Sequence, residues 1–269
     1  MSKLETMTDG YVHGYATAEQ ERLILQAEHW RDDLILDGTA LAPGTRLLEV
    51  GCGVGAVLGI LGDAFPDIEL SGVDIEERQI ETAHEHLAGL GLTADLRVAD
   101  AAALPFADAS FDHVWMMWFL EHVADPVAVL REAQRVLVSG GALTAIEVDY
   151  NSVWADPMTD GFAALFRTVA AAMEAGGWSD AGARLPGWLE EAGFSSVDPG
   201  ERRLRYTGES LARQVPYVAD VVEATLPDLV RIPGASASLL EQGLADLRTL
   251  ATVPDAAIGW DIHKSHAIR

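Results

Sequence analysis

A short apolar segment that leads into three alternately placed glycines constrains this chain more than any other feature of its sequence. Residues 47–50 form a run typical of a buried strand, and Gly51, Gly53 and Gly55 follow it. The apolar residues 56–61 then begin a predicted helix. Glycine lets the backbone turn sharply and lets a ligand approach closely, and the first amides of a helix have no partners within it. Strand, turn and helix therefore predict the opening of a nucleotide-binding βαβ unit.

Two classes of cofactor bind at such a turn, and position 49 distinguishes them. Residues 51–56 match the G-x-G-x-x-G/A pattern of dinucleotide sites, which alone is a weak indicator. Glu49 precedes the first glycine by two residues, and a carboxylate there suits a cationic amino-acid ligand but repels a pyrophosphate. The pattern Glu-x-Gly-x-Gly-x-Gly resembles motif I of the class I S-adenosylmethionine-dependent methyltransferases. The resemblance implies S-adenosyl-L-methionine as cofactor and S-adenosyl-L-homocysteine as product, with these first candidate contacts: Glu49, Gly51, Cys52, Gly53 and Gly55.

Acidic residues also end the second and third predicted strands. Asp74 lies where a carboxylate can accept hydrogen bonds from both ribose hydroxyls of an adenosine ligand, although a helix N-cap is its structural alternative. Ile75 resembles the apolar residue that packs on the adenine face in this family. By the same resemblance, Asp100 and the backbone amide of Ala101 are expected to bind the adenine ring.

The next segment extends the resemblance to the fourth strand. Residues 104–112, Leu-Pro-Phe-Ala-Asp-Ala-Ser-Phe-Asp, are similar to a stretch that precedes this strand in many such methyltransferases and that dinucleotide dehydrogenases lack. The strand ends at Met117, which joins the candidate cofactor contacts. Residues 47–148 follow the family order, in the branch related to ubiquinone and menaquinone biosynthesis. We therefore expect an α/β fold: a Rossmann-like, seven-stranded mixed sheet in the order 3-2-1-4-5-7-6 with helices on both faces.

The chain is predicted to have three parts. Residues 1–40 would form an N-terminal arm and an amphipathic helix (18–37) that together act as a lid. Residues 41–150 would form the cofactor-binding core. Residues 151–269 would complete the sheet and carry a helical cap at about 209–252, where substrate choice commonly resides.

Two tyrosines in the arm are further candidates. Tyr11 and Tyr15 flank His13 and Gly14 just before the first predicted helix. An aromatic segment in this place often covers the cofactor pocket in related methyltransferases, which makes both tyrosines candidate cofactor contacts. The alternative is that they only anchor a terminal arm.

Methyl transfer from a sulfonium is an in-line displacement, so a base is needed only where the acceptor must lose a proton. Such a base contributes about 10²–10⁴-fold. Ligands in open α/β sheets bind beyond the carboxyl ends of the strands, here strands four and five. We select His122, whose imidazole suits proton transfer near neutral pH, then Asp149, with Tyr15 from the arm. A structural or cofactor-side role for His122 is the alternative. The wider set of candidates also contains Glu121, Tyr150 and His13.

Charge and composition restrict the partners. The formal net charge of −24 disfavours nucleic acids and anionic membranes, because affinity for them requires Lys and Arg against phosphates. No apolar run reaches the roughly 20 residues that a bilayer span needs. We therefore expect a small-molecule substrate, no membrane insertion, and a monomer or homodimer.

The cellular compartment and metal content are expectations of the same kind. Cys52 is the single cysteine, so no intramolecular disulfide can form, and the first residues do not resemble a signal peptide; both features favour the cytoplasm. The eight histidines show no ligand-type spacing, which predicts no metal site.

These features together predict methyl transfer to a carbon, oxygen or nitrogen atom of a small, apolar or aromatic metabolite, quinone-like or from secondary metabolism. One rival is an NAD-dependent oxidoreductase or epimerase. The other is a methyltransferase-like protein that binds the cofactor without catalysis.

Overall fold

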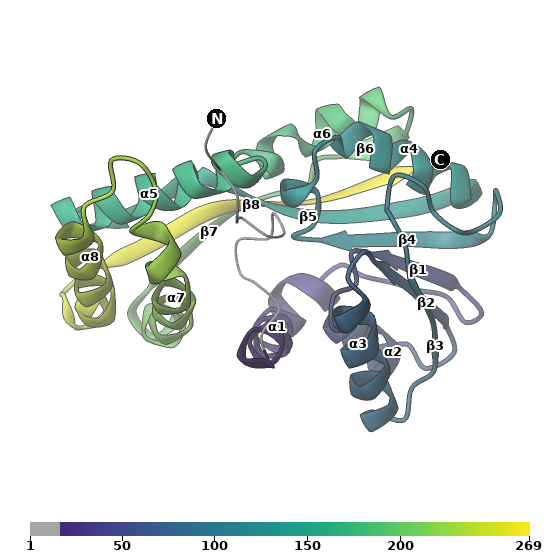
Figure 1. Cartoon of the computed structure of the whole chain (residues 1–269), viewed down its shortest axis with the longest axis horizontal. Coiled ribbons are helices and arrows are strands. Elements are labelled where there is room, and N and C mark those ends of the chain that lie inside the picture. Colours follow the sequence, from purple (N-terminus) through teal and green to yellow (C-terminus); the bar gives the residue numbers. More distant parts are fainter. Residues whose placement is uncertain (1–16) are drawn as a thin grey trace, which may run out of the picture.

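The computed structural model describes residues 17–269, and a single twisted sheet runs through this part of the chain (Figure 1). Its strands follow the order β3-β2-β1-β4-β5-β8-β6, and β7 also pairs with β8. Their bounds are β1 Arg46–Val50, β2 Glu69–Asp74, β3 Ala94–Val98, β4 Phe111–Met117, β5 Leu137–Asp156, β6 Ser195–Asp198, β7 Glu201–Thr207 and β8 Ala257–Ile268.

The predicted strand order 3-2-1-4-5-7-6 is confirmed, with β8 as the seventh strand. The sixth strand is divided into β6 and β7, which both pair antiparallel with β8. Pro199 and Gly200 separate the two pieces, and Gly200 has a left-handed φ of +56°. Proline cannot donate a ladder hydrogen bond and glycine accepts this conformation readily, so the strand is interrupted at this pair.

The parallel part of the sheet brings the candidate cofactor residues together. β3, β2, β1, β4 and β5 run parallel, whereas β8 is antiparallel to β5. The carboxyl ends of the parallel strands therefore meet at one edge. Gly51, Asp74, Asp100 and Met117 all lie at or just beyond these ends.

Helices cover both faces of the sheet, as predicted (Figure 1). One face carries α1 (Thr17–His29), α2 (Ala56–Ala64) and α3 (Glu77–Gly89), and the other carries α4 (Pro126–Val136) and α6 (Ala181–Glu191). Each face has its own buried apolar cluster: Leu47 and Trp115 belong to one, and Leu48 and Val114 to the other. This alternation along β1 and β4 is the period-2 pattern of strands that are buried on both sides.

The first helix is shorter than the sequence predicts, and the prediction of one helix over 18–37 is wrong. α1 ends at His29, and a π-helical turn follows over Arg31–Leu36. The Lys264 ammonium from β8 donates to the carbonyl oxygens of Leu34 (2.8 Å) and Asp37 (2.6 Å). This contact with the far end of the chain satisfies carbonyls that a continued α-helix would bond internally.

The second half of the chain extends the sheet beyond β4. β5 is 20 residues long, and it continues beside β8 to Asp156, with a register shift between Asp149 and Trp154. Two helices, α5 (Asp160–Gly176) and α7 (Gly208–Leu229), pack on this extension, and α8 (Ala237–Thr249) packs against both of them. α7 contains Pro216 and Pro227 and continues to Leu229. Short 3-10 turns lie at Leu120–His122 and Leu250–Thr252. Within residues 17–269, no helix combines the length and apolarity that a bilayer span requires.

Candidate active site

A cavity of about 870 Å³ begins at the glycine turn and continues beneath α5 and α7. This volume is near the upper end of the roughly 300–1,000 Å³ typical of small-molecule sites. α1 forms another wall through Leu23, Gln26 and Ala27, and Trp30 directly after it adds to this wall, so the first described helix covers the pocket. A cavity of this size can hold a cofactor together with a second, apolar molecule.

The glycine turn faces the cavity with bare backbone. Gly51, Gly53 and Gly55 all have left-handed φ values, of +74°, +49° and +71°. A side chain at Gly51 would overlap the Phe119 ring, whereas the space beside Gly53 is open. Gly55 does not line the cavity; a Cβ atom there would lie 3.1 Å from that of Ala83 in α3. The first two glycines therefore admit a ligand and the third permits helix packing.

Asp74 organises the turn from the end of β2. Its carboxylate oxygens accept hydrogen bonds from the backbone amides of Gly53 (2.9 Å) and Glu76 (3.0 Å). Burial raises the pKa of Asp74, and these amide contacts oppose the shift. Each oxygen keeps a lone pair for another donor, so both the capping and the ligand role proposed from the sequence are compatible with the geometry.

Glu49 lies on β1, next to β2 in the sheet. Its side chain is 3% exposed, and its Oε2 atom has no hydrogen-bond partner among the described residues. Burial raises the pKa of Glu49 well above its ordinary value, and the Asp74 charge acts in the same direction. A buried carboxylate is costly without a donor, so this atom is suited to a cationic or hydrogen-bonding ligand group.

The remaining candidate cofactor contacts lie around the same end of the cavity. Asp100 is exposed, and its Oδ1 atom accepts from the Ala102 amide at 2.8 Å. Ile75 lines the cavity while 65% exposed, as an apolar residue open to a ligand. The wall also contains Ala101, Met117 and Cys52. Burial raises the pKa of the Cys52 thiol well above its ordinary value, which disfavours a reactive thiolate.

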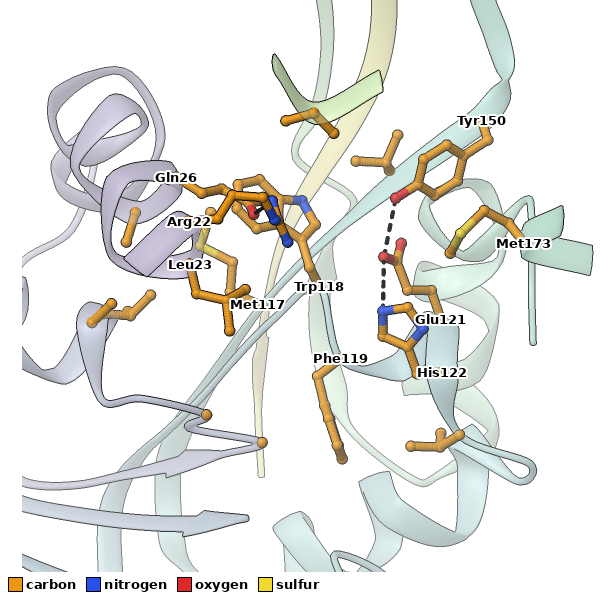
Figure 2. Close-up of a pocket in the computed structure, with 18 of the residues that line it drawn as sticks. Arg22, Leu23, Gln26, Met117, Trp118, Phe119, Glu121, His122, Tyr150 and Met173 are labelled. Carbon is orange, nitrogen blue, oxygen red and sulfur yellow. Dashed lines mark hydrogen bonds and ion pairs between the residues drawn. The ribbon is translucent and has the colours of Figure 1, made fainter. Parts of the chain in front are cut away.

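A second polar cluster lies where the cofactor end meets the cap (Figure 2). The Glu121 Oε1 atom accepts a hydrogen bond from the Tyr150 hydroxyl at 3.1 Å, and the Nε2 atom of His122 lies 3.3 Å from it. Glu121 is only 2% exposed. Figure 2 places Glu121 between Tyr150 and His122, with Arg22 and Gln26 of α1 on the other side of Trp118.

The segment that carries this cluster is held from two directions. The Glu147 Oε1 atom accepts from the amides of Phe119 (3.0 Å) and Leu120 (2.7 Å). On the other side, Trp178 donates its backbone amide to the Glu121 carbonyl (2.9 Å) and its indole N–H to the Val123 carbonyl (2.9 Å). These contacts secure a left-handed φ of +49° at Trp118, which a bulky residue does not adopt unaided.

The candidate catalytic residues are placed differently from one another. His122 lines the cavity beside Glu121. Asp149 is absent from the cavity wall although Val148 and Tyr150 are part of it, and its Oδ1 atom accepts from the Asn151 amide. Tyr11, Tyr15 and His13 lie outside the described residues.

Two groups of residues at the cavity were underestimated from the sequence. Glu121 was one candidate among several, yet its buried carboxylate lines the cavity. The wall contributed by α7, including Tyr217, Val218 and Val222, was missed. The amphipathic pattern of α7 could indicate a buried face but not what that face covers.

Comparison with known proteins identifies the domain around this site. Residues 48–145 match the family described as "Methyltransferase domain". Residues 48–145 therefore form a class I methyltransferase domain. The chain is 37% identical over 133 residues to 27-O-demethylrifamycin SV methyltransferase of Amycolatopsis mediterranei, covering 49% of this chain and 48% of that protein. It is 30% identical over 145 residues to a ubiquinone/menaquinone biosynthesis C-methyltransferase of Desulfotalea psychrophila, covering 54% and 57%.

The chain thus spans about half the length of these curated relatives, whereas solved structures match nearly all of it. YcgJ of Bacillus subtilis superposes with a TM-score of 0.57 at 18% identity, covering 90% of this chain and 98% of that one. The [4+2]-cyclase SpnF superposes with a TM-score of 0.54 at 23% identity, covering 96% and 85%. At these identities the likeness concerns the fold alone, and one fold can host several reactions.

Proposed function

We propose that this protein transfers a methyl group from S-adenosyl-L-methionine to a small, apolar or aromatic molecule. The observation that carries the proposal is the row of three acidic residues along neighbouring strands, Glu49, Asp74 and Asp100, which all line one end of the cavity. The likeness to small-molecule methyltransferases of quinone and rifamycin metabolism supports the same conclusion.

The residues at this end fit the proposed cofactor. The unpartnered oxygen of Glu49 would accept from the ammonium group of the methionine moiety, and Asp74 would accept from the ribose hydroxyls. Asp100 and the Ala101 amide would bind the adenine edge, with Ile75 against its face. Gly51, Gly53, Cys52 and Met117 would line the path between them. The sulfonium supplies an activated methyl group, so the chain's main contribution is to align donor and acceptor.

A dinucleotide-dependent oxidoreductase is not favoured. A pyrophosphate at the glycine turn would lie near the buried carboxyl of Glu49 and the carboxylate of Asp74, and like charges at short range oppose such binding. The relatives named above are methyltransferases.

Calorimetric titration with S-adenosyl-L-methionine, S-adenosyl-L-homocysteine and NADH tests the cofactor. We expect both sulfur ligands to bind and NADH not to bind. Asp74→Ala should weaken binding by about 10²-fold, because two hydrogen bonds to a charged group are lost. Asp67→Ala, at an exposed carboxylate outside the cavity, is the matched control. Binding of NADH alone would refute the proposal.

Turnover distinguishes an enzyme from a protein that only binds the cofactor. Radiolabelled methyl groups from S-adenosyl-L-methionine should enter an organic-extractable product when apolar acceptors are supplied. Tight binding of both sulfur ligands with no transfer to any acceptor would indicate the catalytically silent alternative.

A further inference from the structure

The carboxylate of Glu121 has a free acceptor atom at the junction of the cofactor end and the cap. Its Oε1 atom is engaged by Tyr150 and His122, whereas its Oε2 atom is buried with no hydrogen-bond partner among the described residues. Glu121 is only 2% exposed, and it lines the cavity. A buried acceptor left unpaired destabilises the fold, and more so when it is charged, so a bound donor would stabilise it.

The surroundings of Glu121 restrict what that donor belongs to. Beyond it the cavity wall is formed by apolar side chains of α5, α7 and β8, among them Leu165, Val169, Met173, Val222, Ile258 and Ile262. Such a wall binds an apolar body and offers little to a strongly hydrated group. The ligand that fits both features is a large apolar molecule with one hydrogen-bond donor directed at Glu121.

Glu121 is linked to the glycine turn through Phe119. Phe119, two residues before it, occupies the space that a side chain at Gly51 would need. The donor group of the ligand is thereby brought next to the end of the cavity where the cofactor is proposed to bind.

We propose that Glu121 is a catalytic residue that takes the proton from a hydroxyl group of a large apolar acceptor, which is methylated on that oxygen. This inference rests on the proposed methyltransferase function. A hydroxyl group can donate to Glu121 while it keeps a lone pair for attack. A protonated amine has no such lone pair and would bring a charge into an apolar cavity.

The step is balanced without any further reactant. The acceptor O–H bond breaks as its proton passes to the Glu121 carboxylate, and the oxygen forms a bond to the methyl carbon. The carbon–sulfur bond breaks, its electron pair stays on sulfur, and the sulfonium becomes a neutral thioether. The proton leaves Glu121 for solvent once the methyl ether has left.

Tyr150 and His122 act as positioning residues in this arrangement. The Tyr150 hydroxyl donates to the Oε1 atom of Glu121, and the Nε2 atom of His122 contacts the same oxygen. These contacts leave Oε2 for the acceptor. Burial and the Glu121 charge raise the pKa of Tyr150 well above its ordinary value, so its hydroxyl stays a donor.

Pairs of oxygen and sulfur acceptors test the proposal, because a thiol ionises more readily than a hydroxyl and its thiolate needs no base. We would measure methyl transfer to 2-naphthol, the larger phenol estradiol, 2-naphthalenethiol and 2-naphthylamine in the wild type and Glu121→Gln. Glu191→Gln, at an exposed carboxylate of α6, is the matched control. Calorimetry with S-adenosyl-L-homocysteine and thermal unfolding would verify that each variant is folded and binds the cofactor product.

We expect the wild type to form the methyl ethers and Glu121→Gln to do so about 10²–10⁴-fold more slowly, while its rate on the thiol stays close to the wild-type rate. An unchanged rate on the phenols, or an equal loss on phenol and thiol, would overturn the catalytic role. Transfer to the amine or the thiol but to no phenol would overturn the acceptor class. Transfer to another apolar acceptor that lacks a hydroxyl group, with no transfer to either phenol, would also overturn it. Absence of that binding in the wild type would instead refute the proposed function.

Discussion

The contact between Glu147 and the segment that carries Glu121 yields the prediction that the structure supports in most detail. Glu147 is fully buried, and one of its oxygens accepts from the amides of Phe119 and Leu120 at 3.0 and 2.7 Å. Glu147→Ala removes that acceptor and leaves both amides buried without it. At about 1–3 kcal/mol for each unpaired group, the free energy of unfolding should fall by about 2–6 kcal/mol.

Glu147→Gln is the matched variant, because the amide oxygen of glutamine can accept from the same two N–H groups. We expect it to retain most of the stability at neutral pH. Urea denaturation of the wild type and both variants would measure the difference. A loss in Glu147→Ala no greater than in Glu147→Gln would refute the assigned role of these two hydrogen bonds.

Comparison of the wild type with Glu147→Gln gives a prediction for the pH dependence of stability. Burial and the Glu121 charge raise the pKa of Glu147 well above its ordinary value of 4.5, so the folded state holds this proton more tightly than the unfolded chain. The stabilisation that the protonated Glu147 adds to the folded state is therefore fully present below pH 4.5, and it is lost as pH rises toward the folded pKa. Between these limits the wild type should lose up to about 1.4 kcal/mol per pH unit relative to Glu147→Gln. A difference that is flat above pH 4.5, or of opposite slope, would contradict the reasoning.

Four further variants test other parts of the site. Gly51 and Gly53 both have a left-handed φ, so an alanine at either position is strained. Gly51→Ala should unfold about 1–3 kcal/mol more easily than Gly53→Ala, because its Cβ also overlaps Phe119, whereas the Gly53→Ala Cβ enters open space and should weaken S-adenosyl-L-homocysteine binding; denaturation and calorimetry would separate the two effects. Tyr150→Phe removes the hydroxyl donor to Glu121 and should slow transfer to phenols by about tenfold while sparing the thiol, and an equal effect on both acceptors would point to a merely structural role. Val169→Trp should fill the apolar end and abolish transfer to estradiol before it affects cofactor binding, and retained turnover would place the acceptor elsewhere.

Local patterns were sufficient for the cofactor half of the fold. Apolar spacing and glycine positions predicted the strand–turn–helix opening, and the resemblance of residues 47–148 to the methyltransferase family implied the strand order and the helices on both faces. Asp74 was predicted from its place at the end of a strand and Asp100 from the resemblance, and both line the cavity. Gly55 illustrates the limit of such reasoning, because the motif places it with the cofactor contacts while the structure packs it against Ala83.

The acceptor half could not be obtained in the same way. His122 and Asp149 were selected for their chemistry, yet only His122 reaches the cavity. The pairing of Glu121 with Tyr150 joins residues 29 positions apart, and the contact of Lys264 with the turn after α1 spans 230 positions. Neither segment has a sequence periodicity that predicts these contacts.

The sequence by itself therefore determined the βαβ opening and its glycine turn, because these depend on backbone conformation and on short-range spacing, and its resemblance to a family implied the order of the sheet. Only the tertiary structure decided which oxygen of Glu121 has no partner among the described residues and which helices enclose the apolar end of the cavity. Those outcomes depend on which surfaces meet across the sheet and on how far water is excluded there, and burial of this kind is a property of the assembled fold.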